Sequence, residues 1–424
     1  MRTIDARTRA GTRELRRLLD ARRASPDFAT LRRIDPIVKE ILRKGRGPLA
    51  RFVRRFDGVS ISAKELLVDP FRGPPPAVDP AFARAFRLAV NRVRAYHARQ
   101  RPRGFRFTDG LGVRFVETPF PLDSVGVYVP GGRAFYPSSL LMGVVPARVA
   151  GVRRIVAATP PKAYFGSAEL RWALRELGVR EVLLAGGAHG VAGLVSVGRV
   201  AKVVGPGNRF VAAAKHLVST VVAVDLPAGP SEVLVVASAD APAGAVAADL
   251  LAQAEHDPDA VCLFFTTSAL LVRKVLGEVE RQMVGLPTAK TARRALARNG
   301  RAVLFRSLDD AVAAGLDLAA EHVQVMGTSA AKLATRLLPT AGALFIGSTT
   351  PTAFGDYVAG PNHVLPTGGA ARSFSGLSVR DFVRWGRSVE VGARAAKRLG
   401  PAAAVLARFE GLAAHERAIR RRLA

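Results

Sequence analysis

Apolar residues recur at helical spacing near both ends of the chain. Stretches 13–23 and 36–56 carry them on an arginine-rich background, and 80–100 places Phe82, Phe86 and Val90 on one helical face. The pattern predicts helices over these three ranges and again from Ser378 to the end. Residues 105–119 alternate between apolar and polar positions, which predicts a strand.

Short apolar runs separated by helix-like segments occupy the middle of the chain. The runs fall at 125–129, 154–158, 181–185 and 202–204, and then at 232–236 and 260–266. The helix-like segments are 140–150, 167–177, 208–218, 243–256 and 269–283. Buried strands that alternate with helices are typical of parallel, doubly wound sheets, so we expect an α/β fold with two such units.

Gly-rich turns follow several of the predicted strands, at 128–132, 186–190 and 205–208. Ligands bind at the carboxyl ends of strands in open parallel sheets, so these turns are expected to line a crevice. None of them has the GxGxxG spacing or the P-loop pattern, and each taken alone indicates no more than a tight chain reversal.

Composition narrows the class of protein. A chain of 424 residues is too long for one hydrophobic core, which predicts two large domains. Its single cysteine, Cys262, lies in an apolar run and suits a reducing compartment. With a charged N-terminus and no apolar stretch long enough to cross a bilayer, we expect a cytoplasmic protein without a membrane anchor.

The net charge of +29 raises the alternative of a nucleic-acid-binding protein. The arginines are spread over the whole chain, and no zinc finger or aromatic stacking motif accompanies them. Basic charge alone bears on partners and solubility, so nucleic-acid binding is the less favoured interpretation.

Histidines in polar surroundings are the candidates for chemistry. Gln253 and His256 stand three residues apart at a predicted helix end, where both could ligate one cation or simply be solvated. Asp356 and His363 lie in a loop rich in Gly and Pro, which could carry a site.

Two further pairs of residues give weaker evidence for a functional site when each is taken alone. Glu321 and His322 offer adjacent proton acceptors with different intrinsic pKa values. Glu410 and His415 lie in the last predicted helix, where an exposed charged surface is the simpler interpretation.

Taken together, ordered segments across nearly the whole chain resemble the histidinol dehydrogenase family. The matching segments are 55–58, 125–132, 136–139, 204–208, 227–234, 253–256, 321–322, 362–369 and 374–379. The resemblance implies NAD-dependent, zinc-dependent oxidation of L-histidinol to L-histidine through L-histidinal, the last step of histidine biosynthesis.

The same resemblance assigns roles to residues of this chain. It implies one zinc ion per subunit, held by Gln253, His256, Asp356 and His415. It makes His322 the base that takes a proton in each oxidation and Glu321 the group that activates water.

Further contacts follow from the resemblance. The expected substrate contacts are Ser231, Gln253, His256, His322, Asp356, His363, Glu410 and His415. The expected cofactor contacts are Tyr128, His189 and Asn208. His189 stands where the family normally has glutamine, which puts the affinity for NAD in question.

The family fold implies two incomplete Rossmann-like, doubly wound domains with helical N- and C-terminal extensions. The expected division is 1–22 as the N-terminal extension, 23–127 with 233–375 as one domain, 128–232 as the other, and 376–424 as the C-terminal helical domain. Family members are intertwined homodimers, so Glu410 and His415 are expected to complete the site of the partner subunit.

Two other functions stay open at this point. One is a paralogous zinc and NAD dehydrogenase that oxidises another small amino alcohol or polyol. The other is a basic nucleic-acid-binding protein on a retired enzyme scaffold. Retention of Glu410 and His415 favours histidinol over other alcohols, and retention of Glu321 and His322 argues against a retired scaffold.

Overall fold

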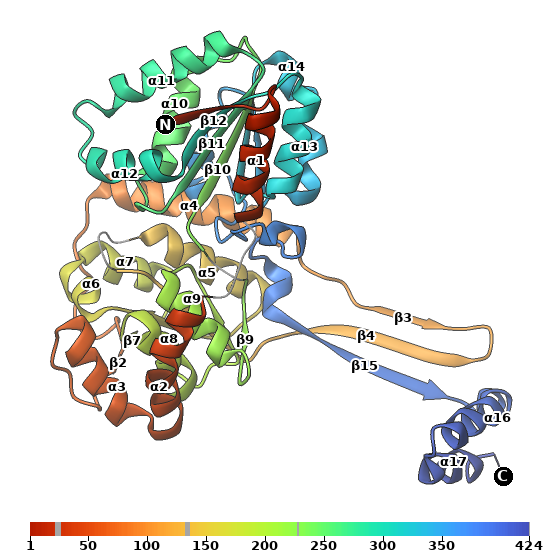
Figure 1. Cartoon of the computed structure of the whole chain (residues 1–424). Coiled ribbons are helices and arrows are strands. Elements are labelled where there is room, and N and C mark those ends of the chain that lie inside the picture. The colour runs from red at the N-terminus through yellow and green to blue at the C-terminus, as the bar shows by residue number, and fades with distance from the viewer. Residues whose placement is uncertain (22–26, 132–135, 227–228, 424) are drawn as a thin grey trace.

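Two lobes and one projecting arm make up the chain (Figure 1). The computed structural model describes residues 1–424 except 22–26, 132–135, 227–228 and 424. The end of the predicted helix 13–23, the turn residue Gly132 and residues 227–228 of the matching segments therefore lie outside the described residues.

A six-stranded, all-parallel sheet forms the first lobe, called here the β10 lobe. Its strands, in spatial order, are β1 (Arg2–Asp5), β12 (Gly300–Leu304), β11 (Val261–Thr266), β10 (Glu232–Ala237), β13 (His322–Met326) and β14 (Ala343–Ile346). Successive strand residues point to opposite faces, and helices cover both faces. One face packs on α10 (Ala243–Ala254), α11 (Ala269–Met283) and α12 (Ala289–Asn299). The other packs on α1 (Arg9–Ala21), α13 (Leu308–Leu318), α14 (Thr328–Ala331) and η2 (Ala334–Thr340).

The second lobe, called the β5 lobe, also has a six-stranded sheet. Its strands, in spatial order, are β2 (Leu67–Val68), β7 (Glu181–Leu184), β6 (Arg154–Thr159), β5 (Ser124–Tyr128), β8 (Lys202–Val204) and β9 (Ala223–Val224). Only the β2–β7 pair is antiparallel. One face packs on α4 (Pro80–Ala98), α5 (Pro137–Ala150), α6 (Pro161–Gly166) and α7 (Ala168–Glu176). The other packs on α2 (Phe28–Lys44), α3 (Arg46–Phe52), η1 (Val53–Asp57), α8 (Gly187–Ser196) and α9 (Arg209–Val218).

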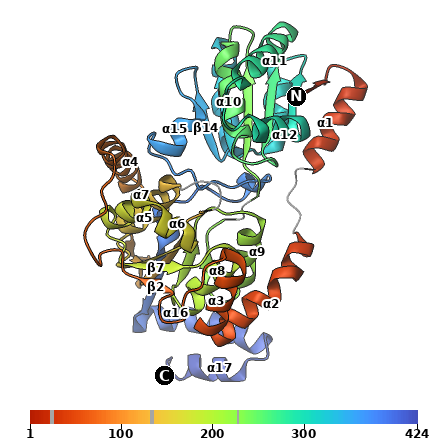
Figure 2. The same ribbon diagram turned by 90° about the vertical axis from the view of Figure 1, so that its left-hand side faces the viewer.

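An antiparallel ribbon forms the arm, which projects sideways from the lobes and ends in two helices (Figure 1). Its strands, in spatial order, are β15 (Val383–Val391), β4 (Val113–Pro121) and β3 (Phe105–Thr108). The helices at its far end are α16 (Ala393–Phe409) and α17 (Ala413–Arg420). The view turned by 90° keeps the β10 lobe above the β5 lobe (Figure 2).

A crossing segment leads the chain from the β10 lobe back to the β5 lobe and the arm. It contains α15 (Thr352–Tyr357), η3 (Ala370–Arg372) and η4 (Val379–Phe382). Asn362 of this segment donates to the carbonyl of Met142 in α5, and Arg92 of α4 donates to the carbonyls of Val358 and Ala359. Apolar residues after Gly360, among them Val364, join the core of the β5 lobe. The lobes are thus fastened along the edge where the crossing segment passes.

The α/β fold with two parallel, doubly wound sheets is confirmed. Two local predictions were wrong. Residues after Ser378 are not helical throughout, because β15 pairs over nine residues with β4. The N-terminal extension is not helical throughout, because Arg2–Asp5 forms the edge strand β1.

The domain division stays a prediction, although the strand pairing departs from it at two places. The N-terminal strand pairs inside the β10 lobe rather than forming a separate extension. Helices α2 and α3 and strand β2 pack in the β5 lobe, where the division assigns 23–127 to the other domain.

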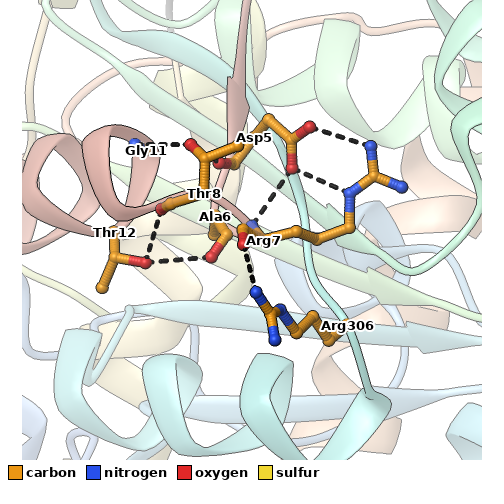
Figure 3. Close-up of polar contacts among 7 residues, drawn as sticks. All are labelled: Asp5, Ala6, Arg7, Thr8, Gly11, Thr12 and Arg306. Carbon is orange, nitrogen blue, oxygen red and sulfur yellow. Dashed lines mark hydrogen bonds and ion pairs between the residues drawn. The ribbon is translucent and has the colours of Figure 1, made fainter.

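A compact polar turn anchors the N-terminal strand to its lobe (Figure 3). The Arg7 guanidinium donates to both carboxylate oxygens of Asp5, each at 2.8 Å, and Arg306 donates to the carbonyl of Arg7. The side-chain hydrogen bond from Arg7 lowers the pKa of Asp5 to about 2. Gly11 is required here, because a Cβ at this position would lie 1.9 Å from the Asp5 carbonyl oxygen.

No helix among the described residues is both long enough and apolar enough to span a membrane.

A buried ion pair holds the end of the β5 lobe together. The Lys215 ammonium pairs with Asp225, whose side chain is fully buried, and also donates to the carbonyl of Gly205. Asp225 in turn accepts the N–H of Gly205 at 2.7 Å. The pair therefore fixes the Gly205 turn to the segment that leads into β10.

We predict that Lys215→Met lowers the free energy of unfolding by about 3–5 kcal/mol, because it leaves the Asp225 charge buried without a partner. Urea unfolding followed by circular dichroism measures the change. The matched control is Lys39→Met, which removes an exposed i,i+4 pair with Asp35 and should have little effect. Equal loss in both variants would contradict the structural role of the buried pair.

Candidate active site

Two carboxylates, Glu232 and Glu321, and the imidazole of His322 meet where β10 and β13 begin. Parallel pairing sets Val233 opposite His322, which brings Glu232, Glu321 and His322 together although 89 residues separate Glu232 from Glu321. The N–H of Glu232 donates to the Glu321 carboxylate at 2.8 Å, and the N–H of Glu321 donates back to the Glu232 carboxylate at 3.4 Å. All three residues are buried.

The orientation of the His322 ring is set by the main chain. Its Nδ1 lies 3.2 Å from the carbonyl oxygen of Glu232, which can only accept, so Nδ1 carries a proton. The other nitrogen, Nε2, faces the Asp356 carboxylate at 3.9 Å. In the neutral ring Nε2 is therefore the basic atom.

Burial and charge act on His322 in opposite directions. Burial lowers the pKa of the imidazole, but the charges of Glu321 and Asp356 and the hydrogen bonds to Glu321 and Glu232 outweigh it and raise the pKa to about 9. The ring therefore carries a proton at pH 7, and it can act as a base only in the molecules that have lost this proton, whose share grows as the pH rises toward 9.

Asp356 and His363 adjoin this cluster from the crossing segment. Asp356 lies near the end of α15, and His363 donates from Nδ1 to the Asp356 carbonyl at 3.0 Å. Burial lowers the pKa of His363, so its imidazole is neutral at pH 7. Within the described part of the chain, the Asp356 carboxylate forms no hydrogen bond and keeps both oxygens available as ligands.

Gln253 and His256 lie at the end of α10, on the same side of the sheet as His322. Gln253 is in the last turn and buried, whereas His256 follows the helix and is exposed. Helix α10 contacts α15, which carries Asp356. Neither side chain forms a hydrogen bond with the described residues, so both are free to ligate. Oxygen and nitrogen donors of this kind suit zinc.

Glu410 and His415 lie far from this cluster. Glu410 follows α16 and His415 is in α17, both exposed at the far end of the arm (Figure 1). The structure does not bring them to the other candidate ligands of the same chain. Accordingly, no group of three or more His, Cys, Asp or Glu side chains in the described residues is arranged to hold a metal ion.

The candidate cofactor residues line the carboxyl ends of strands in the β5 lobe. Tyr128 ends β5, and its buried hydroxyl accepts the N–H of Gly187 at 2.8 Å. Burial raises the pKa of this hydroxyl, so it keeps its proton. Asn208 caps α9, accepting the N–H groups of the first turn. Gly205 has φ +122°, and a Cβ there would lie 2.3 Å from the Tyr128 carbonyl oxygen.

His189 is the residue at which this chain departs from the expected glutamine. Its buried ring binds Asp57 through Nε2 at 2.8 Å and lies against the ring of Phe56. Asp57 also accepts the N–H of Gly186 at 3.1 Å. The pair thus fixes the turn at the start of α8, the same turn that Tyr128 holds through Gly187.

The candidate residues of the two lobes lie at opposite ends of their strands. Tyr128 lies at a carboxyl end, as the open-sheet rule predicts. Glu232 and His322 instead lie at amino ends, because each is the first residue of its strand. Ser231 directly precedes β10 and belongs to the same edge.

Comparison with known proteins bears on the identity of this site. The histidinol dehydrogenase family model matches residues 21–423. Histidinol dehydrogenase of Bradyrhizobium diazoefficiens is 44% identical over 394 residues, which cover 91% of each chain. That of Geobacillus kaustophilus is 42% identical over 392 residues, covering 91% of this chain and 92% of the relative.

The chain belongs to the histidinol dehydrogenase family. A solved histidinol dehydrogenase from Elizabethkingia anophelis superposes with a TM-score of 0.88 at 28% identity, covering 100% of this chain and 98% of that one. An acetylating aldehyde dehydrogenase from Geobacillus thermoglucosidasius matches with a TM-score of 0.52 at 14% identity, covering 90% and 97%. The second likeness shows a shared fold and nothing more.

Two residues that this histidinol dehydrogenase family member places at the site were not singled out from the sequence. Glu232 orients both Glu321 and His322, and Asp57 holds His189. Glu232 lies in the matching segment 227–234, and its local signal was a carboxylate at the head of an otherwise apolar strand, 232–237. Asp57 lies in the matching segment 55–58, but nothing local indicated its role, because its partner is 132 residues away.

Proposed function

We propose that this chain oxidises L-histidinol to L-histidine through L-histidinal, with zinc and NAD. The observation that carries the proposal is the buried Glu321–His322 pair, oriented by Glu232 and facing Asp356. Membership of the histidinol dehydrogenase family supports the same reaction and makes the protein an oxidoreductase.

The metal ligands would be Gln253, His256 and Asp356 from one chain and His415 from its partner. The first three side chains lie at the contacting ends of α10 and α15 with no competing hydrogen bonds among the described residues. When bound, zinc would hold the substrate's imidazole and amine, and NAD would accept a hydride in each oxidation. Ser231, His363 and Glu410 are proposed to contact the substrate as well.

His322 is proposed to be the base. In the first oxidation the alcohol loses a hydride and its hydroxyl proton, which Nε2 of His322 accepts, and the aldehyde results. Water then adds to the aldehyde: Glu321 takes a proton from the water, and protonated His322 returns its proton to the carbonyl oxygen, so that the hydrate forms and His322 can accept a proton again. The hydrate loses a second hydride, His322 accepts the hydroxyl proton again, and the carboxylate forms. The burial of Glu321 and His322 keeps the reactive aldehyde away from bulk water between the two steps.

Tyr128, His189 and Asn208 are proposed to form the cofactor site. Their turns lie at the carboxyl ends of β5, β7 and β8, and the backbone there is held by Tyr128 and by the His189–Asp57 pair. Because Nε2 of His189 is bound to Asp57, we infer that His189 acts mainly by positioning the turn. A cytoplasmic location remains a prediction from the sequence.

We also propose that two chains form an intertwined dimer. The arm carries His415 and Glu410 away from its own lobes, so each arm would complete the partner's site. Large apolar side chains are exposed on the arm, with Phe409 85%, Leu406 65% and Val389 62% exposed. Large apolar side chains exposed to this degree are typical of an interface.

The central prediction concerns stoichiometry. Zinc-loaded protein with L-histidinol and NAD should form two NADH per histidinol consumed, because the oxidation removes four electrons. NADH absorbance and chromatographic assay of histidine measure both quantities. Chelation and His322→Ala should each abolish turnover, whereas the exposed His216→Ala should not. No turnover by folded, zinc-loaded protein would rule out histidinol, and another small alcohol that is oxidised instead would identify a paralogous dehydrogenase.

The second prediction concerns the cofactor turn. His189→Ala should raise the KM for NAD about tenfold or more, because the buried Asp57 carboxylate loses a hydrogen-bond donor. The KM for histidinol should stay nearly unchanged. His189→Gln restores a donor and should recover most of the affinity. Steady-state kinetics with varied NAD checks this, and an unchanged KM in His189→Ala would contradict the positioning role.

The third prediction tests the arm. Homodimers of His322→Ala and of His415→Ala should both be inactive. A heterodimer of the two, purified with two different tags, should regain about half of the wild-type activity, since one of its sites receives an intact base and an intact partner arm. An inactive heterodimer would show that His415 acts within its own chain or not at all.

A further inference from the structure

A buried lysine of the β5 lobe fastens the root of the arm. Lys202 is the first residue of β8 and is 8% exposed. Its ammonium donates to the main-chain carbonyl of Asp381 at 2.8 Å and to a carboxylate oxygen of the same residue at 3.4 Å. An ammonium group this deeply buried is costly unless it is paired. The contact therefore ties η4, from which β15 leads outward, to the sheet of the β5 lobe.

Both long strands of the arm meet the lobe at this lysine. The first of them, β4, ends at Pro121, and the chain enters the sheet as β5 at Ser124. The next residue, Val125, is the parallel partner of Lys202. The second strand, β15, begins at Val383, just after Asp381. Lys202 thus joins the outgoing strand of the arm to the place where the incoming strand runs into the sheet.

The rest of η4 is seated firmly in the same lobe. Val379 and Phe382 are fully buried in its core. The N–H of Val379 donates to the Gln100 side chain at 3.3 Å, and the Asp381 carboxylate accepts the N–H of Ser378 at 2.8 Å. Asp381 therefore closes the turn of η4 with its carboxylate while its carbonyl receives Lys202. The direction in which β15 leaves the lobe is set where these contacts meet.

The length of the arm magnifies any change at its root. The nine residues of β15 span about 30 Å, and α16 and α17 lie beyond its far end (Figure 1). A rotation of about 10° at the root would move the far end of a 30 Å strand by about 5 Å. Distances at a zinc site vary by only about 0.2 Å. A side chain such as His415 can reach a zinc site from the arm only if the root holds its direction.

We propose that Lys202 is a positioning residue that aims the arm, so that its loss disturbs the active site of the partner subunit and spares the site in its own lobes. The inference rests on the proposed intertwined dimer and on the proposed role of His415. Holding the arm in its bound direction lowers the entropic cost of completing the partner's site.

The test places one substitution on either side of the single working site of a heterodimer. In the first heterodimer one chain carries Lys202→Met and the other carries His322→Ala. In the second heterodimer both substitutions are in one chain and the other chain is wild type. The working site of the first has its lobes from the Lys202→Met chain, and that of the second has its arm from it. Both are purified with two different tags, and wild type paired with His322→Ala is the reference.

The first heterodimer should oxidise histidinol as fast as the reference. The second should reach at most about a tenth of that rate, because a misplacement of about 1 Å can lower a rate by about 100-fold. The KM for NAD should be the same in both. The two proteins contain the same substitutions in total, so a general loss of stability would lower both rates alike.

Zinc affinity gives a second measurement that does not depend on turnover. The Lys202→Met homodimer should bind zinc about tenfold or more weakly in competition with a chromophoric chelator. The matched control is Arg148→Met, which removes donors to the carbonyls of Arg153 and Gly178 within the β5 lobe and should keep wild-type affinity. Melting temperatures of both metal-free variants are recorded. If Lys202→Met does not fold, Lys202→Gln, which stays polar but is one atom too short, replaces it with the same expectations.

Equal rates of the two heterodimers would overturn the proposal, as would a loss in the first alone, since Lys202 would then act on its own lobe. Wild-type zinc affinity in the Lys202→Met homodimer would also overturn it. An inactive heterodimer of His322→Ala with His415→Ala would refute the intertwined site and this inference together. If the wild type binds zinc but does not oxidise histidinol, the proposed substrate alone is refuted, and the zinc affinities still decide the role of Lys202.

Discussion

The parallel pairing of β10 with β13 is the constraint on which the candidate site depends. It sets the main chain of Glu232 beside Glu321 and His322, so that backbone groups fix the orientation of the His322 ring. Side chains alternate along a strand, so a slip of one residue would turn His322 to the opposite face of the sheet, away from α10. The register is held by the apolar residues of both strands, which pack on helices on either face. The geometry of the site therefore depends on how the core beneath it is packed.

Much of the fold follows from periodicity in the sequence. Strands β5, β6, β7, β8, β10 and β11 are short apolar runs, and the helices between them carry apolar residues at helical spacing, so these elements were predicted close to their observed bounds. Strands β12, β13 and β14 were not predicted. The strand β15 was missed because most of its side chains are exposed on both faces of the ribbon, which leaves no alternation of burial to detect. The strand β1 was missed because four residues are too few to show a period.

The candidate site was predictable in composition but not in arrangement. Gln253 with His256, Asp356, and His322 were separate weak candidates in the sequence, and only the resemblance to a family joined them into one site, because no local spacing relates α10, α15 and β13. Packing between elements far apart in the sequence sets His322 beside Asp356 and brings α10 into contact with α15. His415 could not be placed by reasoning about one chain, since the arm carries it away from the other candidate ligands.

The pairing of β1 with β12 has a consequence for the order of folding. Arg2 pairs with Arg301, which is made much later during synthesis. During synthesis the sheet of the β5 lobe, which ends with β9, is complete long before β12 emerges from the ribosome. The lobe that contains Glu232, Glu321 and His322 is therefore the later one to form, and strand β1 remains unpaired until β12 has been made. Contacts so distant in sequence form slowly, so an early nascent chain exposes β1 as an unpaired edge that chaperones can shield.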